Sequence, residues 1–185
     1  MDLRYIDLEF LKPHEETIPK RVKEIEEEIK GGKEIPPIVV VEVDSYFVVI
    51  DGHHRVKVAR NLGFSKILAY ILSLEEYLNN EKVKLFSWNI MVPKSYIEGK
   101  EDWFEKREED VLYLKNQFRE LVAKKVIEEL EESEYKFIPG DSEIEIEEGY
   151  VLIKRKPFSK KEVIERALEG KLFPPKSTRH ILDLT

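Results

Sequence analysis

Residues 48–63 read VVIDGHHRVKVARNLG. The first three residues, from Val48 to Ile50, favour a β-strand, and Asp51-Gly52 ends it. Apolar residues then recur at helical spacing from Val56 to Leu62, and Gly63 follows as a stop signal. The stretch therefore predicts a strand, a tight turn and a helix that begins directly after the turn.

The turn in this stretch carries five consecutive functional residues, Asp51, Gly52, His53, His54 and Arg55. A glycine lets backbone N–H groups approach a ligand, and a helix N-terminus adds donors and a positive dipole end. The imidazoles and the guanidinium also favour an anion, whereas Asp51 would repel one unless a divalent cation lay between them. These residues suggest a site for a magnesium-bound phosphate chain. The alternative is a capped turn in which Asp51 accepts backbone hydrogen bonds and Arg55 pairs with a surface carboxylate.

The composition restricts the class of protein. The 185 residues are 37% charged and 42% hydrophobic, which is typical of a globular protein with a densely charged surface. No apolar run reaches the length of a membrane span and no secretion signal is recognisable, so we expect a cytoplasmic protein. The absence of cysteine excludes disulfides, thiolate metal sites and cysteine nucleophiles. A single glutamine beside abundant Glu and Lys favours a thermophilic source.

The charge balance bears on possible partners. The net charge of −7 and the pI near 5.3 argue against a broad basic face for nucleic acid, so we expect no nucleic acid and no membrane as partner. This charge does not exclude a small phosphate ligand, because such a ligand responds to the local field of a few grouped cations.

The hydropathy pattern predicts an α+β fold, with a soft boundary in residues 93–99. Strands are expected over residues 5–10, 35–43, 46–50, 66–72 and 83–90, and a further hairpin over residues 143–156 with its turn near Glu148-Gly149. Helices are expected over residues 18–30, 53–62, 75–81, 103–132 and 159–170. Ser159 and Glu162 form a capping box at the start of the last helix.

Two further sets of polar residues are candidates for a functional site. Glu15 precedes the expected helix at residues 18–30, where a carboxylate is also favoured simply by the helix dipole. Near the other end, residues 176–180 place lysine, hydroxyl, arginine and imidazole groups in succession, and all of these can donate to a phosphate or carboxylate. The alternative for residues 176–180 is a solvated polar tail. Trp88, near the end of an expected strand, is by itself most often a core residue.

Four motifs together resemble a known family. They are LKPHE at 11–15, VIDGHHR at 49–55, FSW at 86–88 and RKPFSKKEVIERALEGKLFPPKSTRHIL at 155–182. This combination resembles the free serine kinases of archaea, which have the ParB/sulfiredoxin fold. The resemblance implies a ParB/sulfiredoxin-like nucleotide-binding domain over residues 1–92 and a smaller α/β C-terminal lobe over residues 93–185 that completes the substrate site.

The resemblance also implies an activity: transfer of a phosphoryl group from ADP or ATP, with Mg²⁺, to the hydroxyl of free L-serine, giving O-phospho-L-serine for cysteine biosynthesis. By similarity, Glu15 matches the catalytic acid and Asp51 the carboxylate near the metal and phosphates. The implied phosphate-binding turn is Gly52, His53, His54 and Arg55, and the implied substrate residues are Trp88, Lys176, Ser177, Thr178, Arg179 and His180. We expect these groups to converge on one pocket. Residues 89–143 depart most from the family pattern, which leaves the choice between ADP and ATP open.

Other functions are compatible with the same fold class. A ParB-like protein that binds CTP and DNA would need a basic helical reader, whereas the helix expected over residues 103–132 has mixed charge. Sulfiredoxin chemistry would need a cysteine beside the phosphate-binding turn, and the chain has none. A non-catalytic nucleotide-binding module is the third alternative.

Overall fold

The computed structural model describes residues 2–184, which form two compact units. Unit 1 comprises Met1–Lys84, Ser159–Phe173 and His180–Thr185, and unit 2 comprises Leu85–Phe158 and Pro174–Arg179. The chain therefore leaves unit 1 after Lys84 and returns to it twice. No helix within residues 2–184 combines the length and the apolarity needed to cross a membrane.

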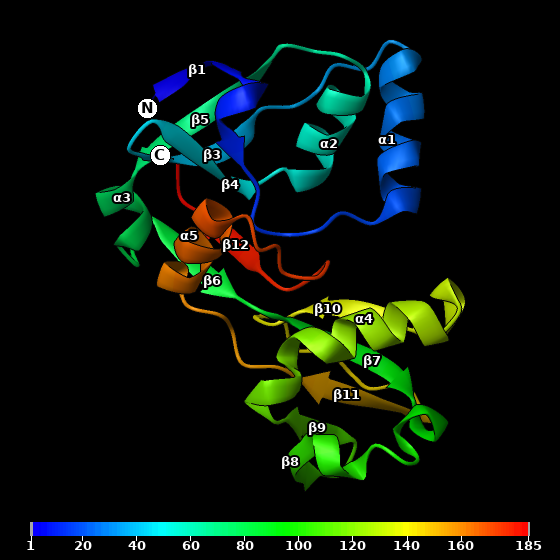
Figure 1. The fold of residues 1–185 in the computed structure, drawn as a ribbon. Coiled ribbons are helices and arrows are strands. Elements are labelled where there is room, and N and C mark those ends of the chain that lie inside the picture. The colour runs from blue at the N-terminus through cyan, green and yellow to red at the C-terminus, as the bar shows by residue number, and fades with distance from the viewer. Residues whose placement is uncertain (1, 185) are drawn as a thin grey trace. The chain divides into compact units, whose positions relative to one another are not determined.

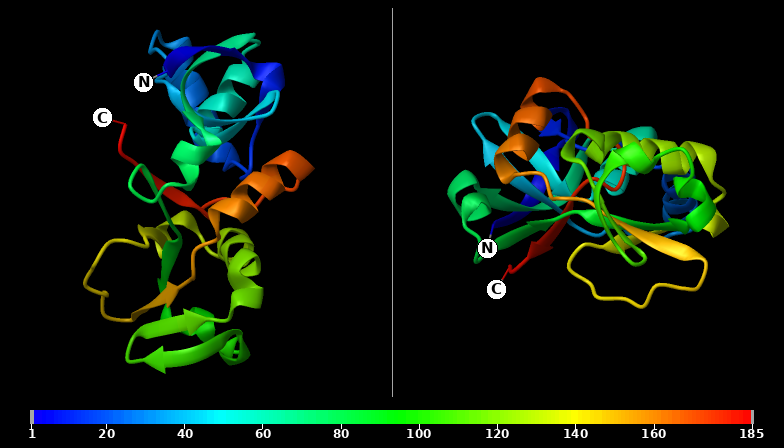
Figure 2. Two further views of the ribbon diagram at one scale, coloured as in Figure 1. Left: turned by 90° about the vertical axis from the view of Figure 1, so that its left-hand side faces the viewer. Right: turned by 90° about the horizontal axis from the view of Figure 1, so that it is seen from below.

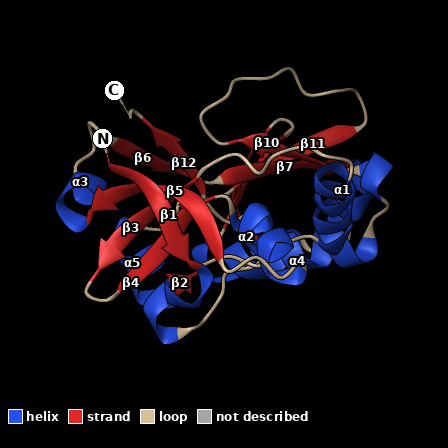
Figure 3. Ribbon diagram, turned by 90° about the horizontal axis from the view of Figure 1, so that it is seen from above, coloured by secondary structure: helices blue, strands red, loops and turns tan. Residues whose placement is uncertain are grey.

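Unit 1 is built on a five-stranded mixed sheet in the order β1-β5-β3-β4-β2. Its strands are β1 (Asp2–Asp7), β2 (Leu11–Lys12), β3 (Ile38–Val43), β4 (Tyr46–Asp51) and β5 (Lys66–Ser73). Its helices are α1 (Pro19–Lys30), α2 (His53–Asn61), α3 (Leu74–Leu78) and α5 (Lys160–Glu169). The expected hairpin is confirmed as β3 and β4, which pair antiparallel, and Figure 3 shows β1, β5 and β3 side by side. The helix expected over residues 159–170 is confirmed as α5, capping box included.

Both faces of this sheet are buried where β3 and β4 run through its centre. Val40 and Val49 face the side of α2, in a cluster that includes Val56 and Ala59. Since side chains alternate along a strand, Val41 points to the other face, where α3 and α5 pack, and it too is fully buried. Figure 1 shows α1 beside α2. The end of β4 is thus fixed from both sides.

Unit 2 contains a second mixed sheet in the order β10-β7-β11-β9-β8. Its strands are β7 (Trp88–Pro93), β8 (Phe104–Glu108), β9 (Val111–Leu114), β10 (Lys136–Pro139) and β11 (Tyr150–Lys154), and its helix is α4 (Arg119–Glu129). Val122 and Val126 of α4 pack on Ile90 and Ile153 of the sheet. Two short strands, β6 (Val83–Phe86) and β12 (Arg179–Leu182), pair with each other in a separate sheet.

The prediction of a helix over residues 103–132 is wrong for its first half. Residues 104–114 form the hairpin β8–β9, which turns at Glu109 with a φ of 54°, and only Arg119–Glu129 is helical. The segment Val111–Leu114 (VLYL) buries Leu112 and Leu114 on one face, which is the two-residue period of a strand. The apolar residues of Val111–Leu114 also fit the helical spacing of α4. The predicted helix therefore extends over them.

The hairpin expected over residues 143–156 is also wrong. Only Tyr150–Lys154 is a strand, and it pairs with β7 and β9. Residues 141–149 form a loop, seen in yellow to orange in Figure 2. Its glutamates are exposed, and Ile146 alone packs beneath it, against the cluster of Met91, Ile138 and Leu152.

The division into units differs from the boundary expected between residues 92 and 93. The strand expected over residues 83–90 is interrupted at Ser87, and its two parts, β6 and β7, belong to different sheets. Helix α5 and Phe173 belong to unit 1, with the N-terminal sheet. The physical reason is burial: Val163 and Phe173 have no exposed surface in unit 1.

Candidate active site

The turn between β4 and α2 has the predicted strand–turn–helix form. Gly52 adopts a left-handed conformation with φ 107° and precedes the first residue of α2, His53. A Cβ atom at Gly52 would lie 2.5 Å from the Cγ2 atom of Ile38, so no other residue fits there without displacement. The first N–H groups of an α-helix have no partner inside the helix, which makes this end suitable for an anion.

Asp51 and Arg55 form an ion pair across the turn. The Nη2 atom of Arg55 lies 3.1 Å from Oδ2 of Asp51, and Nη1 donates to the carbonyl oxygen of Pro37 at 2.5 Å. The guanidinium is thereby tied to the segment that leads into β3. The Asp51 side chain is 51% exposed and remains accessible to a ligand beside this pair.

His53 and His54 both turn their Nε2 atoms toward the segment that contains Glu15. The N–H of His14 donates to Nε2 of His53 at 3.1 Å, and the N–H of Ile18 donates to Nε2 of His54 at 3.0 Å. An Nε2 atom that accepts a hydrogen bond carries no proton, so both rings are neutral in this arrangement. The two histidines of the turn thus hold the chain on both sides of Glu15.

Two further histidines continue this network. His14 is fully buried and donates from Nδ1 to the carbonyl oxygen of Val49 at 2.7 Å. Nε2 of His180 lies 2.8 Å from the Tyr77 hydroxyl, and the ring centroids of His14 and His180 are 5.7 Å apart. Segments from residues 14, 49–54, 77 and 180 are therefore joined by side-chain hydrogen bonds and ring contacts.

The environment keeps the imidazoles of His14, His53 and His180 uncharged. Burial lowers the pKa of His14 to about 4, against the opposing effect of its hydrogen bond to Val49. Removal from water, together with the neighbouring imidazoles of His14, His180 and His54, lowers the pKa of His53 well below 6.5. Removal from water and the nearby His14 and Lys160 likewise lower the pKa of His180, although a backbone hydrogen bond at Ile50 opposes this.

Glu15 lines a cavity of about 360 Å³ in unit 1. The residues around it are Pro13, Glu15, Glu16, Thr17, His53, Val56, Lys57, Arg60 and Leu172. The basic wall is one face of α2, because positions 53, 56, 57 and 60 follow helical spacing. Lys57 and Arg60 were not predicted as site residues, although their spacing from His53 could have revealed them.

The backbone around Glu15 is held by Phe173 as well as by the histidines. The N–H of Glu16 donates to the carbonyl oxygen of Phe173 at 2.8 Å, and the N–H of Phe173 donates to that of His14 at 2.7 Å. Phe173 is fully buried. Nothing in the local sequence pattern pairs residue 15 with residue 173, so this contact could not be predicted.

The fit to Mg²⁺ can be judged from the carboxylates. Within residues 2–184, no group of three or more histidine, aspartate or glutamate side chains is arranged to hold a metal ion. Mg²⁺ is commonly held by one or two carboxylates together with substrate phosphates and water. The accessible Asp51 carboxylate therefore fits a Mg²⁺ ion that arrives with a nucleotide.

The remaining predicted site residues form a group in unit 2. Trp88 Nε1 donates to the carbonyl oxygen of Thr178 at 2.9 Å. The Nζ atom of Lys176 lies 4.2 Å from the centroid of the Trp88 ring, and the guanidinium carbon of Arg179 lies 5.3 Å from it. The Nε atom of Arg179 also pairs with Oδ1 of Asp141 at 3.0 Å, and this contact holds the pKa of Asp141 below its usual value.

The structure thus gathers the predicted residues into two groups. Unit 1 contains Glu15, the turn from Asp51 to Arg55, and His180; unit 2 contains Trp88 and the segment from Lys176 to Arg179. The buried Ser177 hydroxyl donates to the carbonyl oxygen of Pro174 at 2.7 Å, so it stabilises the loop.

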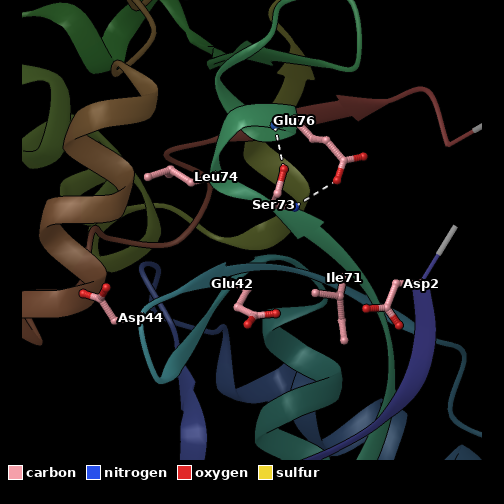
Figure 4. A pocket seen from close by; sticks show the side chains of 7 residues that line it. All are labelled: Asp2, Glu42, Asp44, Ile71, Ser73, Leu74 and Glu76. Carbon is pink, nitrogen blue, oxygen red and sulfur yellow. Dashed lines mark hydrogen bonds between the residues drawn. The ribbon is translucent and has the colours of Figure 1, made fainter.

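A second cavity, of about 430 Å³, lies elsewhere in unit 1 and contains none of the predicted residues. It is lined by Asp2, Glu42, Asp44, Ile71, Ser73, Leu74 and Glu76, as Figure 4 shows. Arg4 pairs with both Asp2 and Glu42, and the Glu76 carboxylate accepts from the N–H of Ser73. Three of its four acidic residues, Asp2, Glu42 and Glu76, thus already have partners within the protein.

Comparisons with known proteins agree with this description. A family described as the ParB N-terminal domain matches residues 1–85, which confirms the expected ParB-like fold. The chain is 32% identical to an ATP-dependent L-serine kinase of Staphylothermus marinus, over 96% of this chain and 84% of the relative. It is 27% identical to the ADP-dependent L-serine kinase SerK of Thermococcus kodakarensis, over 98% of this chain and 88% of the relative.

A solved structure supports the fold over the whole chain. It is a mutant free serine kinase in complex with ADP, with a TM-score of 0.75 and 23% identity, covering 98% of this chain and 88% of that one. Since the sequence relatives extend over nearly all of its residues, the chain belongs to the L-serine kinase family.

Proposed function

We propose that this protein is a nucleotide-dependent L-serine kinase. The serine Oγ atom forms a bond to the terminal phosphorus of the donor, the bond from that phosphorus to the bridging oxygen breaks, and the hydroxyl proton passes to a base. The products are O-phospho-L-serine and a nucleotide with one phosphate fewer. The two L-serine kinases named above use ATP and ADP, respectively, and either nucleotide supplies the chemistry.

The observation that carries this proposal is the position of Glu15. Its carboxylate lines the cavity whose other wall is the face of α2 with His53, Lys57 and Arg60. Phosphoryl transfer needs positioning and charge neutralisation more than covalent catalysis. A carboxylate residue on a fixed backbone, in the same cavity as a basic helix face, meets both requirements.

In this reaction Glu15 orients the serine hydroxyl and takes its proton. The first turn of α2 after Gly52 binds the phosphates through backbone N–H groups, and Arg55 adds positive charge. His53 and His54 contribute by fixing the segment that carries Glu15, because their Nε2 atoms accept hydrogen bonds from it. His180 supports the same network through Tyr77.

Asp51 is the residue that would hold Mg²⁺, together with the nucleotide phosphates. The ion would supply neutralisation of the charge on the transferred group. Such a role requires only that the Asp51 carboxylate shift part of its interaction away from Arg55, which keeps its contact with the carbonyl oxygen of Pro37.

The unit 2 residues are suited to the amino acid. Lys176 and Arg179 are cations held near the Trp88 ring, and they would bind the carboxylate of serine or the phosphate of the product. Thr178 and Ser177 shape the loop on which these cations stand, since the carbonyl oxygen of Thr178 accepts from Trp88.

A kinase assay tests this proposal. The protein is incubated with L-serine, Mg²⁺ and either ATP or ADP, and phosphoserine is measured by mass spectrometry. We expect Glu15→Gln to lower kcat by about 100-fold or more, with little change in the nucleotide KM, because the amide cannot accept the proton. The control is Glu34→Gln, an exposed glutamate outside the cavity.

The competing functions give different results in parallel binding experiments. A ParB-like protein would bind CTP or duplex DNA and form no phosphoserine with either donor. A non-catalytic module would bind ADP or ATP and leave it intact. Either result with the unmodified protein would refute the kinase assignment.

A further inference from the structure

Arg155 is a buried cation that the sequence motifs did not single out as functional. It follows β11 in unit 2 and is 6% exposed. Its Nε atom donates to the carbonyl oxygen of Trp88 at 2.8 Å, Nη1 donates to that of Arg119 at 3.1 Å, and Nη2 donates to that of Lys176. A buried guanidinium is costly unless it is hydrogen-bonded, and here three backbone carbonyls meet that need.

The three carbonyl groups belong to segments that are far apart in the sequence. Trp88 begins β7, Arg119 begins α4, and Lys176 lies in the loop after Pro174-Pro175. The Arg155 side chain bonds to all three. An arginine can do this because its donors diverge in a rigid plane, whereas the lysine ammonium is a compact group on a flexible stem.

The backbone of Arg155 is hydrogen-bonded to the residues on either side of Trp88. Its carbonyl oxygen accepts from the Ser87 hydroxyl at 2.6 Å, and its N–H donates to Oδ1 of Asn89 at 3.4 Å. Both partners are buried and flank Trp88. The position of Trp88 is therefore coupled to Arg155 through three consecutive residues.

The loop held by Arg155 carries the two cations assigned to the amino acid. Arg155 binds the carbonyl oxygen of Lys176, and Trp88 binds that of Thr178. Lys176 has a φ of 59°, a left-handed conformation that costs a residue with a Cβ atom some free energy and persists only where its surroundings impose it. The hydrogen bonds to the carbonyl oxygens on both sides of Ser177 impose this backbone, which keeps Lys176 and Arg179 near the Trp88 ring.

We propose that Arg155 is a positioning residue for the amino-acid substrate: by binding the carbonyl oxygens of Trp88, Arg119 and Lys176 it holds three chain segments together, and it thereby positions Lys176 and Arg179 beside the Trp88 ring without touching the substrate. This inference rests on the proposed function, because that function makes these residues the serine-binding group. It predicts that loss of the Arg155 hydrogen bonds affects the binding of serine and leaves the binding of nucleotide unchanged.

The test compares Arg155→Lys and Arg155→Met in a Trp103→Phe background, which leaves Trp88 as the single tryptophan of the chain. For Arg155→Lys we expect the KM for L-serine to rise about 10-fold or more, while the KM for nucleotide stays within about twofold. We also expect the emission of Trp88 to shift and its quenching by iodide to increase. The matched control is Arg107→Lys, since Arg107 is exposed and donates to a single backbone carbonyl, that of Glu109.

Several outcomes would overturn the inference. An unchanged KM for serine with unchanged Trp88 fluorescence in Arg155→Lys would show that the hydrogen bonds do not organise this surface. Equal increases in the KM for L-serine and the KM for nucleotide, with a large loss of thermal stability, would show that Arg155 has only a general structural role. If Arg155→Met does not fold, Arg155→Lys still decides between these results.

Failure of the proposed function can be distinguished from failure of the inference about Arg155. If the unmodified protein forms no phosphoserine, the kinase assignment is wrong, whatever the variants do. The Trp88 fluorescence of Arg155→Lys then still decides whether Arg155 organises the loop.

Discussion

All four histidines of this chain lie in unit 1, and each has a defined partner. His53 and His54 accept hydrogen bonds from the backbone, His14 donates to Val49, and His180 meets the Tyr77 hydroxyl. A protonated imidazole has no acceptor, so protonation of either residue of the turn would break its bond to the segment around Glu15. The neutral form of these side chains is thus part of the folded structure.

The stability of the protein should therefore fall in mild acid. The folded-state pKa of His14 is about 4, whereas that of an unfolded histidine is about 6.5. At and above pH 7 both states are neutral at this position and His14 adds no pH dependence. As the pH falls from 6.5 to 4, the unfolded chain takes up a proton that the folded chain does not. His14 alone should then lower the free energy of unfolding by about 3 kcal/mol.

Urea unfolding at a series of pH values between 7.5 and 4 measures this effect. His14→Asn provides the comparison, because an amide NH₂ can still donate to Val49 and does not titrate. We expect the variant to lose less stability over this range than the unmodified protein. The same slope in both proteins would show that His14 is not buried in its neutral form.

For the predicted site residues, the sequence indicates the local conformation of the turn. It does not indicate which residues the side chains of the turn contact. Gly52 and the helix start at His53 follow from residue type and spacing. By contrast, the contacts of His53 with residue 14 and of Arg155 with residue 176 join positions that are distant in the chain. Such contacts depend on tertiary packing, to which a local pattern gives no access.

At the scale of secondary-structure elements, the connection between β4 and α2 depends on one glycine. Gly52→Ala would force an L-residue into a φ of 107° and bring its Cβ atom to 2.5 Å from Cγ2 of Ile38. We expect the free energy of unfolding to fall by about 3 kcal/mol, from backbone strain and overpacking together.

Gly63→Ala is the matched control for this substitution. Gly63 also has a positive φ, of 80°, and a Cβ atom there would meet nothing within 4 Å. Strain alone should then lower the free energy of unfolding by about 1 kcal/mol. Urea unfolding of both variants gives the difference, and equal losses would mean that the contact with Ile38 relaxes without cost.

Elements were predicted correctly where the local signals agreed. Helix α5 has a capping box at Ser159, an apolar face and a left-handed Gly170 at its end, and all three were visible in the sequence. In residues 103–132, strand and helix signals followed each other without a glycine or proline between them. The turn at Glu109 and Asp110 has a positive φ at Glu109 but contains neither glycine nor proline, which is why β8 and β9 were missed.

At the scale of the whole molecule, the chain passes between the units four times, after Lys84, Phe158, Phe173 and Arg179. Each unit has its own apolar cluster. Hydropathy shows which residues are buried, but it does not show which unit buries them. The boundary expected at residue 92 places α5 in the second lobe, whereas its contacts place it in unit 1.

This arrangement predicts that a fragment of residues 1–92 will not fold cooperatively. It would lack Val163, Ile164, Ala167 and Phe173, all of which are buried in unit 1. Each large apolar side chain contributes about 2 kcal/mol through burial, and their combined loss approaches the entire stability of a typical domain.

Far-UV circular dichroism during urea titration, together with binding of a hydrophobic dye, tests the fragment against the full chain. We expect a broad transition and strong dye binding. A sharp transition with the midpoint of the full chain would show that the first 92 residues are an autonomous domain after all.

The late return of the chain has a consequence for biosynthesis. Domains are commonly able to fold in the order in which they emerge from the ribosome. Here residues 174–179 complete the second unit and residues 180–184 contribute to the first, so translation must reach this stretch before either can mature. A chain that ends within residues 174–179 would therefore leave both units incomplete.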